Sequence, residues 1–121
     1  MNFRVLIIPV HREIVQASAY LEQQAGLGAE FLNLVYTNLD AIEANPDSFP
    51  LWESNPLEIE IRRVVLQRFR YIVYFQMIRD EVIVLAVSHA SRDYHNWLNR
   101  VQPLDSWPDQ RNEDQSGGNK S

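Results

Sequence analysis

The sequence predicts an α+β fold in which an N-terminal strand and an antiparallel helical hairpin pack on one face of a small antiparallel sheet. Two neighbouring stretches, residues 11–25 and 27–42, have the spacing of amphipathic helices. Strand-like segments follow after residue 58, and a short apolar run at residues 3–9 precedes the helices. The predicted order is therefore β-α-α-β-β-β, with a short C-terminal helix.

The N-terminal half begins with a run too short for a helix, and we interpret residues 3–9 as a buried strand that Pro9 ends. In the second helical stretch apolar side chains recur every three or four residues, at Leu27, Phe31, Leu34, Val35, Leu39 and Ile42. The link Gly26-Leu27-Gly28 is short, so the two helices form an antiparallel hairpin. The hairpin ends before Asn45-Pro46, because a residue that precedes proline disfavours helical geometry.

The C-terminal half predicts a loop and then three strands. Residues 46–57 contain three prolines, and after Glu58 the alternation of Ile59 and Ile61 with charged residues indicates a strand. Residues 69–75 and 82–87 are β-branched and aromatic, with short polar breaks between them, so the three strands form an antiparallel meander that the first strand joins. The last of these strands is apolar without alternation, which predicts a central position buried on both faces. Residues 94–100 can form a short final helix.

Length and composition predict one domain, residues 1–102, followed by a disordered acidic tail at residues 103–121. The 121 residues include no Cys, which excludes disulfides, thiol chemistry and Cys-ligated zinc. The sequence has no glycine-rich phosphate loop and no metal-ligand spacing among its three His, so we expect no cofactor and no metal. Neither a membrane span nor a secretory signal is recognisable, and a cytoplasmic protein is expected.

The net charge of −5 hides an asymmetry along the chain. Residues 1–57 carry two basic residues against seven acidic ones, whereas residues 58–102 carry seven arginines against five acidic residues. The acidic total argues against a protein that coats nucleic acid non-specifically. It leaves room for a small site in the second half that faces an anion, since the guanidinium fork of Arg suits phosphate and carboxylate groups.

The candidate site residues are arginines and histidines of that second half. Arg92 and His89 follow the last predicted strand, and Arg62 and Arg63 lie in the first strand of the meander. Neighbouring residues on a strand face opposite sides, so at most one of the two would serve a given site. If their strand lies next to the last strand, that Arg could face the same end of the sheet as Arg92. Two Arg and an imidazole there would suit an RNA phosphate: Arg holds the phosphate, while His89 or His95 moves a proton.

The order of these motifs resembles the RelE/ParE superfamily of type II toxin–antitoxin systems, and more narrowly its plasmid-stabilisation branch. The resemblance extends over residues 3–100 and rests on the element order and on Arg62-Arg63, Phe69-Arg70-Tyr71, Tyr74, His89, Arg92-Asp93, Trp97 and Arg100. It implies a toxin that a cognate antitoxin neutralises in a hetero-oligomer. It also makes Arg92 the first catalytic candidate, because relatives often carry a needed Arg at the end of the last strand.

The resemblance leaves the target of the toxin open. RelE-like members cleave mRNA on the ribosome without a metal, through attack of a 2′-hydroxyl on the adjacent phosphate, and ParE-like members block DNA gyrase. The folded part has no Lys, and Arg70 and Tyr94 stand where relatives usually have proline. These departures argue against the ribonuclease and leave open a gyrase-type toxin, or a chain that keeps the fold as a binding module without catalysis. A metal-free hydrolase unrelated to toxins is a third alternative.

Overall fold

The computed structural model of the protein describes residues 3–103. Its elements follow the predicted order: β1 (Arg4–Leu6), α1 (His11–Ala25), α2 (Gly28–Ala44), β2 (Arg62–Val65), β3 (Tyr71–Ile78) and β4 (Glu81–His89). The α+β class and the helical hairpin are therefore confirmed. The predicted tail, residues 103–121, lies outside the described residues except for Pro103.

The sheet has the strand order β1-β4-β3-β2, so β4 is central, as its unbroken apolar sequence predicts. The meander β2–β3–β4 is antiparallel, whereas β1 pairs with β4 in parallel. The sheet is therefore mixed, and the prediction of a purely antiparallel sheet is wrong for its first strand. The long connection through the helical hairpin makes this pairing possible, because parallel neighbours need a crossover between them.

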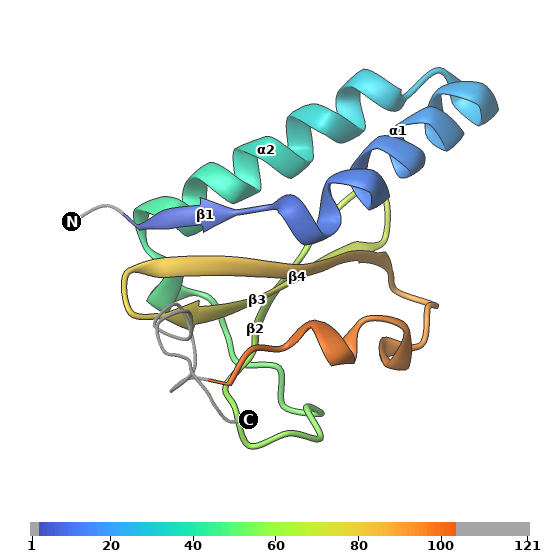
Figure 1. Cartoon of the computed structure of the whole chain (residues 1–121). Helices are drawn as coiled ribbons and strands as arrows, with labels where there is room; N and C mark the ends of the chain where they lie inside the picture. The colour runs from blue at the N-terminus through green and yellow to red at the C-terminus, as the bar shows by residue number, and fades with distance from the viewer. Residues whose placement is uncertain (1–2, 104–121) are drawn as a thin grey trace, which may run out of the picture.

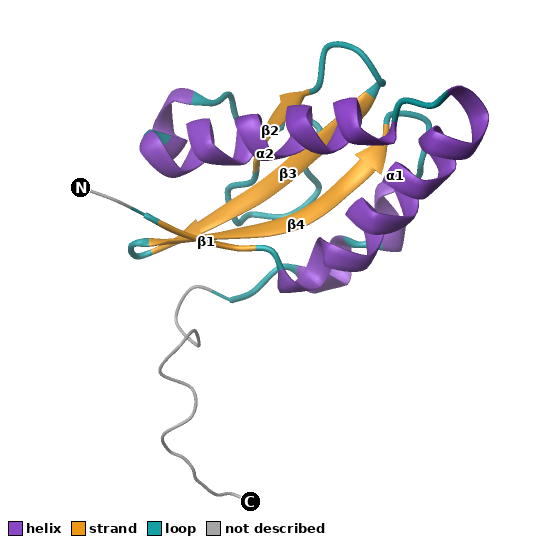
Figure 2. Ribbon diagram, turned by 90° about the horizontal axis from the view of Figure 1, so that it is seen from above, coloured by secondary structure: helices purple, strands orange, loops and turns teal. Residues whose placement is uncertain are grey.

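Both helices cover one face of the sheet (Figure 1), and the view from above shows them lying over the strands (Figure 2). The core on this face joins Ile14 of α1 and Phe31 and Val35 of α2 to Val73 of β3 and Val84 of β4. The opposite face is covered by irregular chain rather than by helices. There Trp52, from the loop before β2, and Trp97, from the segment after β4, pack on inward-facing residues of β3 and β4.

The hairpin turns at Gly26, which has a φ of 70° and lies in the left-handed region that glycine adopts without strain. Its backbone N–H donates to the carbonyl of Glu22, and the N–H of Leu27 donates to that of Leu21, so the turn caps α1. At Gly28 the helices approach closely: a Cβ there would lie 2.8 Å from the carbonyl oxygen of Ser18. Both glycines of the link are thus needed for the antiparallel packing.

Several element bounds differ from the prediction. The first strand ends at Leu6, and Pro9 lies inside a 3₁₀ turn, Ile8–Val10, that leads into α1. The strand predicted from residue 58 begins only at Arg62, since residues 55–59 form a loop closed by the Asn55 side chain. Ile61, between that loop and the strand, is buried against the sheet, so the alternation reflects packing and not strand pairing. The predicted final helix is two 3₁₀ turns, Tyr94–Asn96 and Leu98–Arg100.

The segment after β4 is held to the sheet by Gln76, a buried polar residue of β3. Its side-chain amide donates to the carbonyl of Gln102 at 2.6 Å and accepts from the Gln102 N–H at 3.0 Å. Gln76→Leu is expected to lower the free energy of unfolding by about 1–3 kcal/mol, because two backbone groups lose their partner. Hydrogen exchange should then accelerate in residues 97–102. Gln23→Leu, at an exposed position of α1, is the control, and equal effects of the two changes would contradict the prediction.

Candidate functional site

The predicted residues at the end of the last strand do lie together. A pocket of about 330 Å³, here called the β4-end pocket, is lined by His89 and Arg92 and also by Tyr20 of α1 and Tyr71 of β3. Register explains part of this cluster: Tyr71 is the partner of His89 across β3 and β4, and their rings meet edge to face with centroids 5.4 Å apart. Arg92 reaches the pocket because its backbone N–H closes a turn onto the carbonyl of His89 at 2.9 Å.

Glu13, one of the residues that line the pocket, forms an ion pair with Arg100. Pairing with β1 ends at Ile83, and beyond it the edge of β4 is covered by these two side chains. Glu13 accepts the N–H of Val87 at 3.2 Å, and Arg100 donates to the carbonyl of Leu85 at 2.8 Å. The charged groups themselves are 2.7 Å apart, and both side chains are half-buried. This pair ties α1 and the last segment to the strand that carries the site.

The hydrogen bonds around His89 fix which of its nitrogens carries the proton when the ring is neutral. Nδ1 accepts the backbone N–H of Ser91 at 3.1 Å and lies 2.8 Å from the Ser91 hydroxyl. A nitrogen that accepts an N–H has no proton, so the proton of the neutral ring is on Nε2. His89 therefore offers a hydrogen-bond donor rather than a free base.

His95 has the opposite arrangement. Its Nδ1 lies 2.8 Å from Oδ1 of Asp93, so in the neutral ring Nδ1 carries the proton and Nε2 has the lone pair. The carboxyl of Asp93 also accepts the backbone N–H of His95, and this bond, followed by the one to the ring, lowers the pKa of Asp93. His95 is exposed and does not line the β4-end pocket. The histidine suited to act as a base is thus outside the pocket, and the one inside it is a donor.

Arg62 and Arg63 are not part of this cluster. Their strand is separated from β4 by β3, so the strand adjacency on which their predicted role depends is absent. Arg63 has its register partner at Tyr74, which in turn pairs with Ala86, three residues before His89. At about 4.8 Å per strand and about 3.3 Å per residue, the backbone of Arg63 lies roughly 14 Å from that of His89.

Arg62 has a structural role instead. Its guanidinium donates to the carbonyl of Phe49 at 2.6 Å and approaches the carboxylates of Asp47 and Glu60 at 3.9 and 4.0 Å. It fixes the loop before β2 to the edge of the sheet. The prediction that one residue of the Arg62-Arg63 pair joins Arg92 and a histidine at one end of the sheet is therefore wrong.

Sequence reasoning missed Tyr20 and Glu13, and gave Tyr71 no role. The proximity of Tyr20 to β4 comes from the way α1 packs on the sheet, which no local pattern encodes. Tyr71 has a raised pKa because burial disfavours the phenolate, an effect that the charge of Arg92 opposes and that Tyr20 reinforces. Arg92 and Tyr71 line the same pocket, so the guanidinium charge acts on the phenol group.

Arg92→Ala is expected to raise the pKa of Tyr71 further, because the cation that stabilises its phenolate is lost. The tyrosinate absorbance, compared with that of the Tyr71→Phe protein, measures the titration of this one residue. Since the folded-state pKa lies above the ordinary value of about 10, the unfolded chain ionises first, and stability falls as the pH rises above that value. An unchanged or lower pKa in Arg92→Ala would contradict the contact.

Within residues 3–103, no group of three or more His, Asp or Glu side chains is arranged to hold a metal ion. The helices of the same region are too short or too polar to cross a membrane. A family model described as ParE toxin of type II toxin–antitoxin system, parDE, matches residues 10–94. No curated protein matches the chain significantly.

Proposed function

Because this chain belongs to the ParE toxin family of type II toxin–antitoxin systems, we propose that it arrests growth by blocking DNA gyrase. A protein antitoxin is the partner that this family implies. Of the two targets that the sequence left open, mRNA on the ribosome and DNA gyrase, gyrase is the one proposed here. The toxin is then an inhibitor that acts by binding, with no bond broken in its target.

The separation of the predicted cations is the observation that carries this choice. Cleavage of RNA by its own 2′-hydroxyl needs a base for that hydroxyl and cationic groups around the phosphorane. The β4-end pocket brings Arg92 together with a donor histidine, while Arg62 and Arg63 belong to another part of the sheet and His95 lies outside the pocket. This arrangement supports a binding toxin better than a ribonuclease.

The order in which macromolecular synthesis stops tests the proposal. The chain is induced without its antitoxin, and incorporation of labelled thymidine and labelled leucine is followed from the first minutes. DNA synthesis should fall first, and purified protein should inhibit supercoiling by gyrase. If leucine incorporation falls first, the gyrase target is wrong. Normal growth with verified soluble protein would instead support a binding module without toxicity.

A second candidate function, metal-free cleavage of mRNA, is favoured by one observation: Tyr71, His89 and Arg92 gather in a single pocket. Arg92 would hold the phosphate, and the Nε2–H of His89 would hydrogen-bond to the leaving 5′-oxygen. Water would accept the proton of the attacking 2′-hydroxyl and would supply one to the leaving oxygen as its bond to phosphorus breaks. Under this hypothesis Arg92→Ala abolishes cleavage of mRNA on purified ribosomes, whereas Arg12→Ala, on exposed α1 surface, leaves it intact. Absence of cleavage by the unmodified protein would eliminate this candidate.

A further inference from the structure

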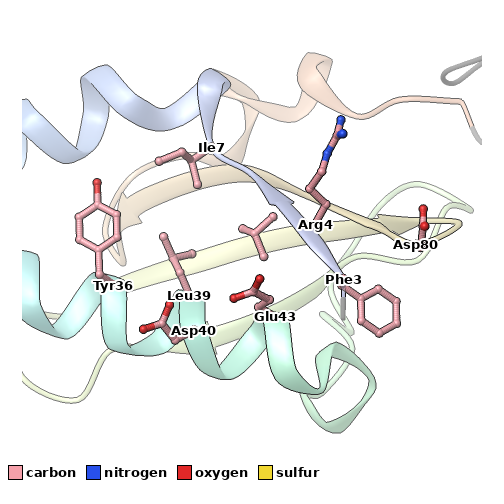
Figure 3. A pocket seen from close by; sticks show the side chains of 9 residues that line it. Phe3, Arg4, Ile7, Tyr36, Leu39, Asp40, Glu43 and Asp80 are labelled. Carbon is pink, nitrogen blue, oxygen red and sulfur yellow. The ribbon is translucent and has the colours of Figure 1, made fainter. Parts of the chain in front are cut away.

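A groove lies between β1 and α2, it shares no lining residue with the β4-end pocket, and neither function above uses it. This β1–α2 groove has a volume of about 520 Å³. Its apolar surface comes from Val5 and Ile7 of the first-strand region and from Tyr36 and Leu39 of α2. Figure 3 shows Ile7 on the side of the first-strand region and Tyr36 and Leu39 on the helix side.

The backbone of β1 is open along this groove. Within the described residues β1 is an edge strand, whose only strand neighbour is β4. Arg4 donates its N–H to the carbonyl of Asp80 on the β4 side, and alternate residues of a strand direct their polar groups to opposite sides. The N–H and C=O of Val5 therefore point to the free edge. Such an edge can accept the backbone of another extended chain.

At the other edge of the sheet, formed by β2, the backbone is not open in the same way. Along β2, Arg63 donates its N–H to the carbonyl of Pro50, and Leu51 forms an isolated bridge with Arg62. The chain before β2 thus covers part of that edge. Beside β1, in contrast, lies the β1–α2 groove.

Charge indicates what would occupy the groove. Asp40 and Glu43 of α2 project into the space between the helix and β1 in Figure 3, and both are exposed. Asp80 adds a third carboxylate at the end of the groove. The basic residue on its wall, Arg4, is already paired with Glu81 at 2.9 Å. The groove therefore presents an apolar surface below a rim of three carboxylates.

We propose that the β1–α2 groove binds an extended, basic segment of a partner protein, which adds to the sheet as a fifth strand beside β1. Alternate side chains of such a strand face the groove. Lys or Arg at these positions fits both of its surfaces, because the aliphatic stem packs on Val5 and Leu39 while the charged end reaches Asp40 and Glu43. The inference goes beyond the proposed function and holds for either target of the toxin.

The test uses the full chain and a fluorescein-labelled heptapeptide of alternating lysine and valine as the probe. The peptide should bind, and an otherwise identical glutamate–valine peptide should not. The double change Asp40→Asn and Glu43→Gln should weaken binding roughly tenfold, which corresponds to about 1.4 kcal/mol for the two exposed ion pairs together. The double change Glu53→Gln and Glu58→Gln removes the same charge from an exposed loop and should leave binding unchanged.

Amide hydrogen exchange then locates the bound peptide. Saturating peptide should slow exchange of the Val5 N–H and leave the β2 edge unaffected. The proposal is overturned if the lysine peptide does not bind, if both double variants bind equally, or if protection appears only at β2. Growth arrest by the Asp40→Asn, Glu43→Gln chain without antitoxin is measured in parallel. Because this assay reports toxicity alone, it separates failure of the groove from failure of the proposed function.

Discussion

Phe31→Ala is expected to lower the free energy of unfolding by about 3–5 kcal/mol, the range for removing a fully buried aromatic side chain. Phe31 is completely buried between α2 and the sheet. Its ring meets those of Phe69 and Tyr71 edge to face, at centroid distances of 5.5 and 5.1 Å. Small domains have total stabilities of about 5–15 kcal/mol, so the loss would be a large share of the whole.

Urea unfolding followed by circular dichroism measures this loss. Tyr36→Ala, on the same helix and 39% exposed, is the matched control and should cost much less. Because Phe31 supports the ring of Tyr71, the change should also disturb the β4-end pocket, which the tyrosinate titration would detect. A loss below about 1 kcal/mol, similar to that of an ordinary surface substitution, would mean that Phe31 is not part of the core.

Trp97→Ala, on the opposite face of the sheet, is expected to lower the free energy of unfolding by a similar amount, about 3–5 kcal/mol. The indole of Trp97 is 2% exposed and lies over Tyr74, with ring centroids 4.5 Å apart, and beside Trp52 at 5.4 Å. It is the largest buried side chain of the segment that carries Asp93 and His95 onto the sheet. Without it that face of β3 and β4 is opened to water.

Chemical denaturation of Trp97→Ala and of the conservative Trp97→Phe separates loss of volume from loss of the ring. The phenylalanine variant should recover a substantial part of the lost stability, since an aromatic ring again covers Tyr74. In the alanine variant, hydrogen exchange should accelerate in residues 94–102 more than in the helical hairpin. A uniform loss of protection, with no difference between the two variants, would count against an anchoring role.

The helices could be predicted from the sequence because their signal is local. The spacing of Phe31, Val35, Leu39 and Ile42 specifies one buried face, and Asn45-Pro46 specifies where it ends. The central position of β4 followed from its apolar composition. These features depend on residues that are neighbours in the chain.

The features that were predicted wrongly or missed depend on contacts between residues that are distant in the chain. Ile61 is buried because it packs against the far face of the sheet, and its alternation with charged residues imitates a strand. Whether Arg62 or Arg63 could join Arg92 depended on strand order, which is set by long-range pairing. Tyr20 enters the candidate site through the crossing of α1 over the sheet, and Glu13 through a bond to the backbone of Val87. None of these contacts has a signature in a short window of sequence.

The pairing of β1 with β4 also has a consequence for when the protein becomes a toxin. Arg4 has its register partner at Glu81, so the first strand finds its place only after the last one has been synthesised. The hairpin contacts are local and can form early, whereas a contact across most of the chain must first overcome the entropy of closing a long loop. Both the β4-end pocket and the β1–α2 groove need β4 for their completion. We therefore expect the nascent chain to be inactive until nearly all of it has been synthesised, because both sites are incomplete before then.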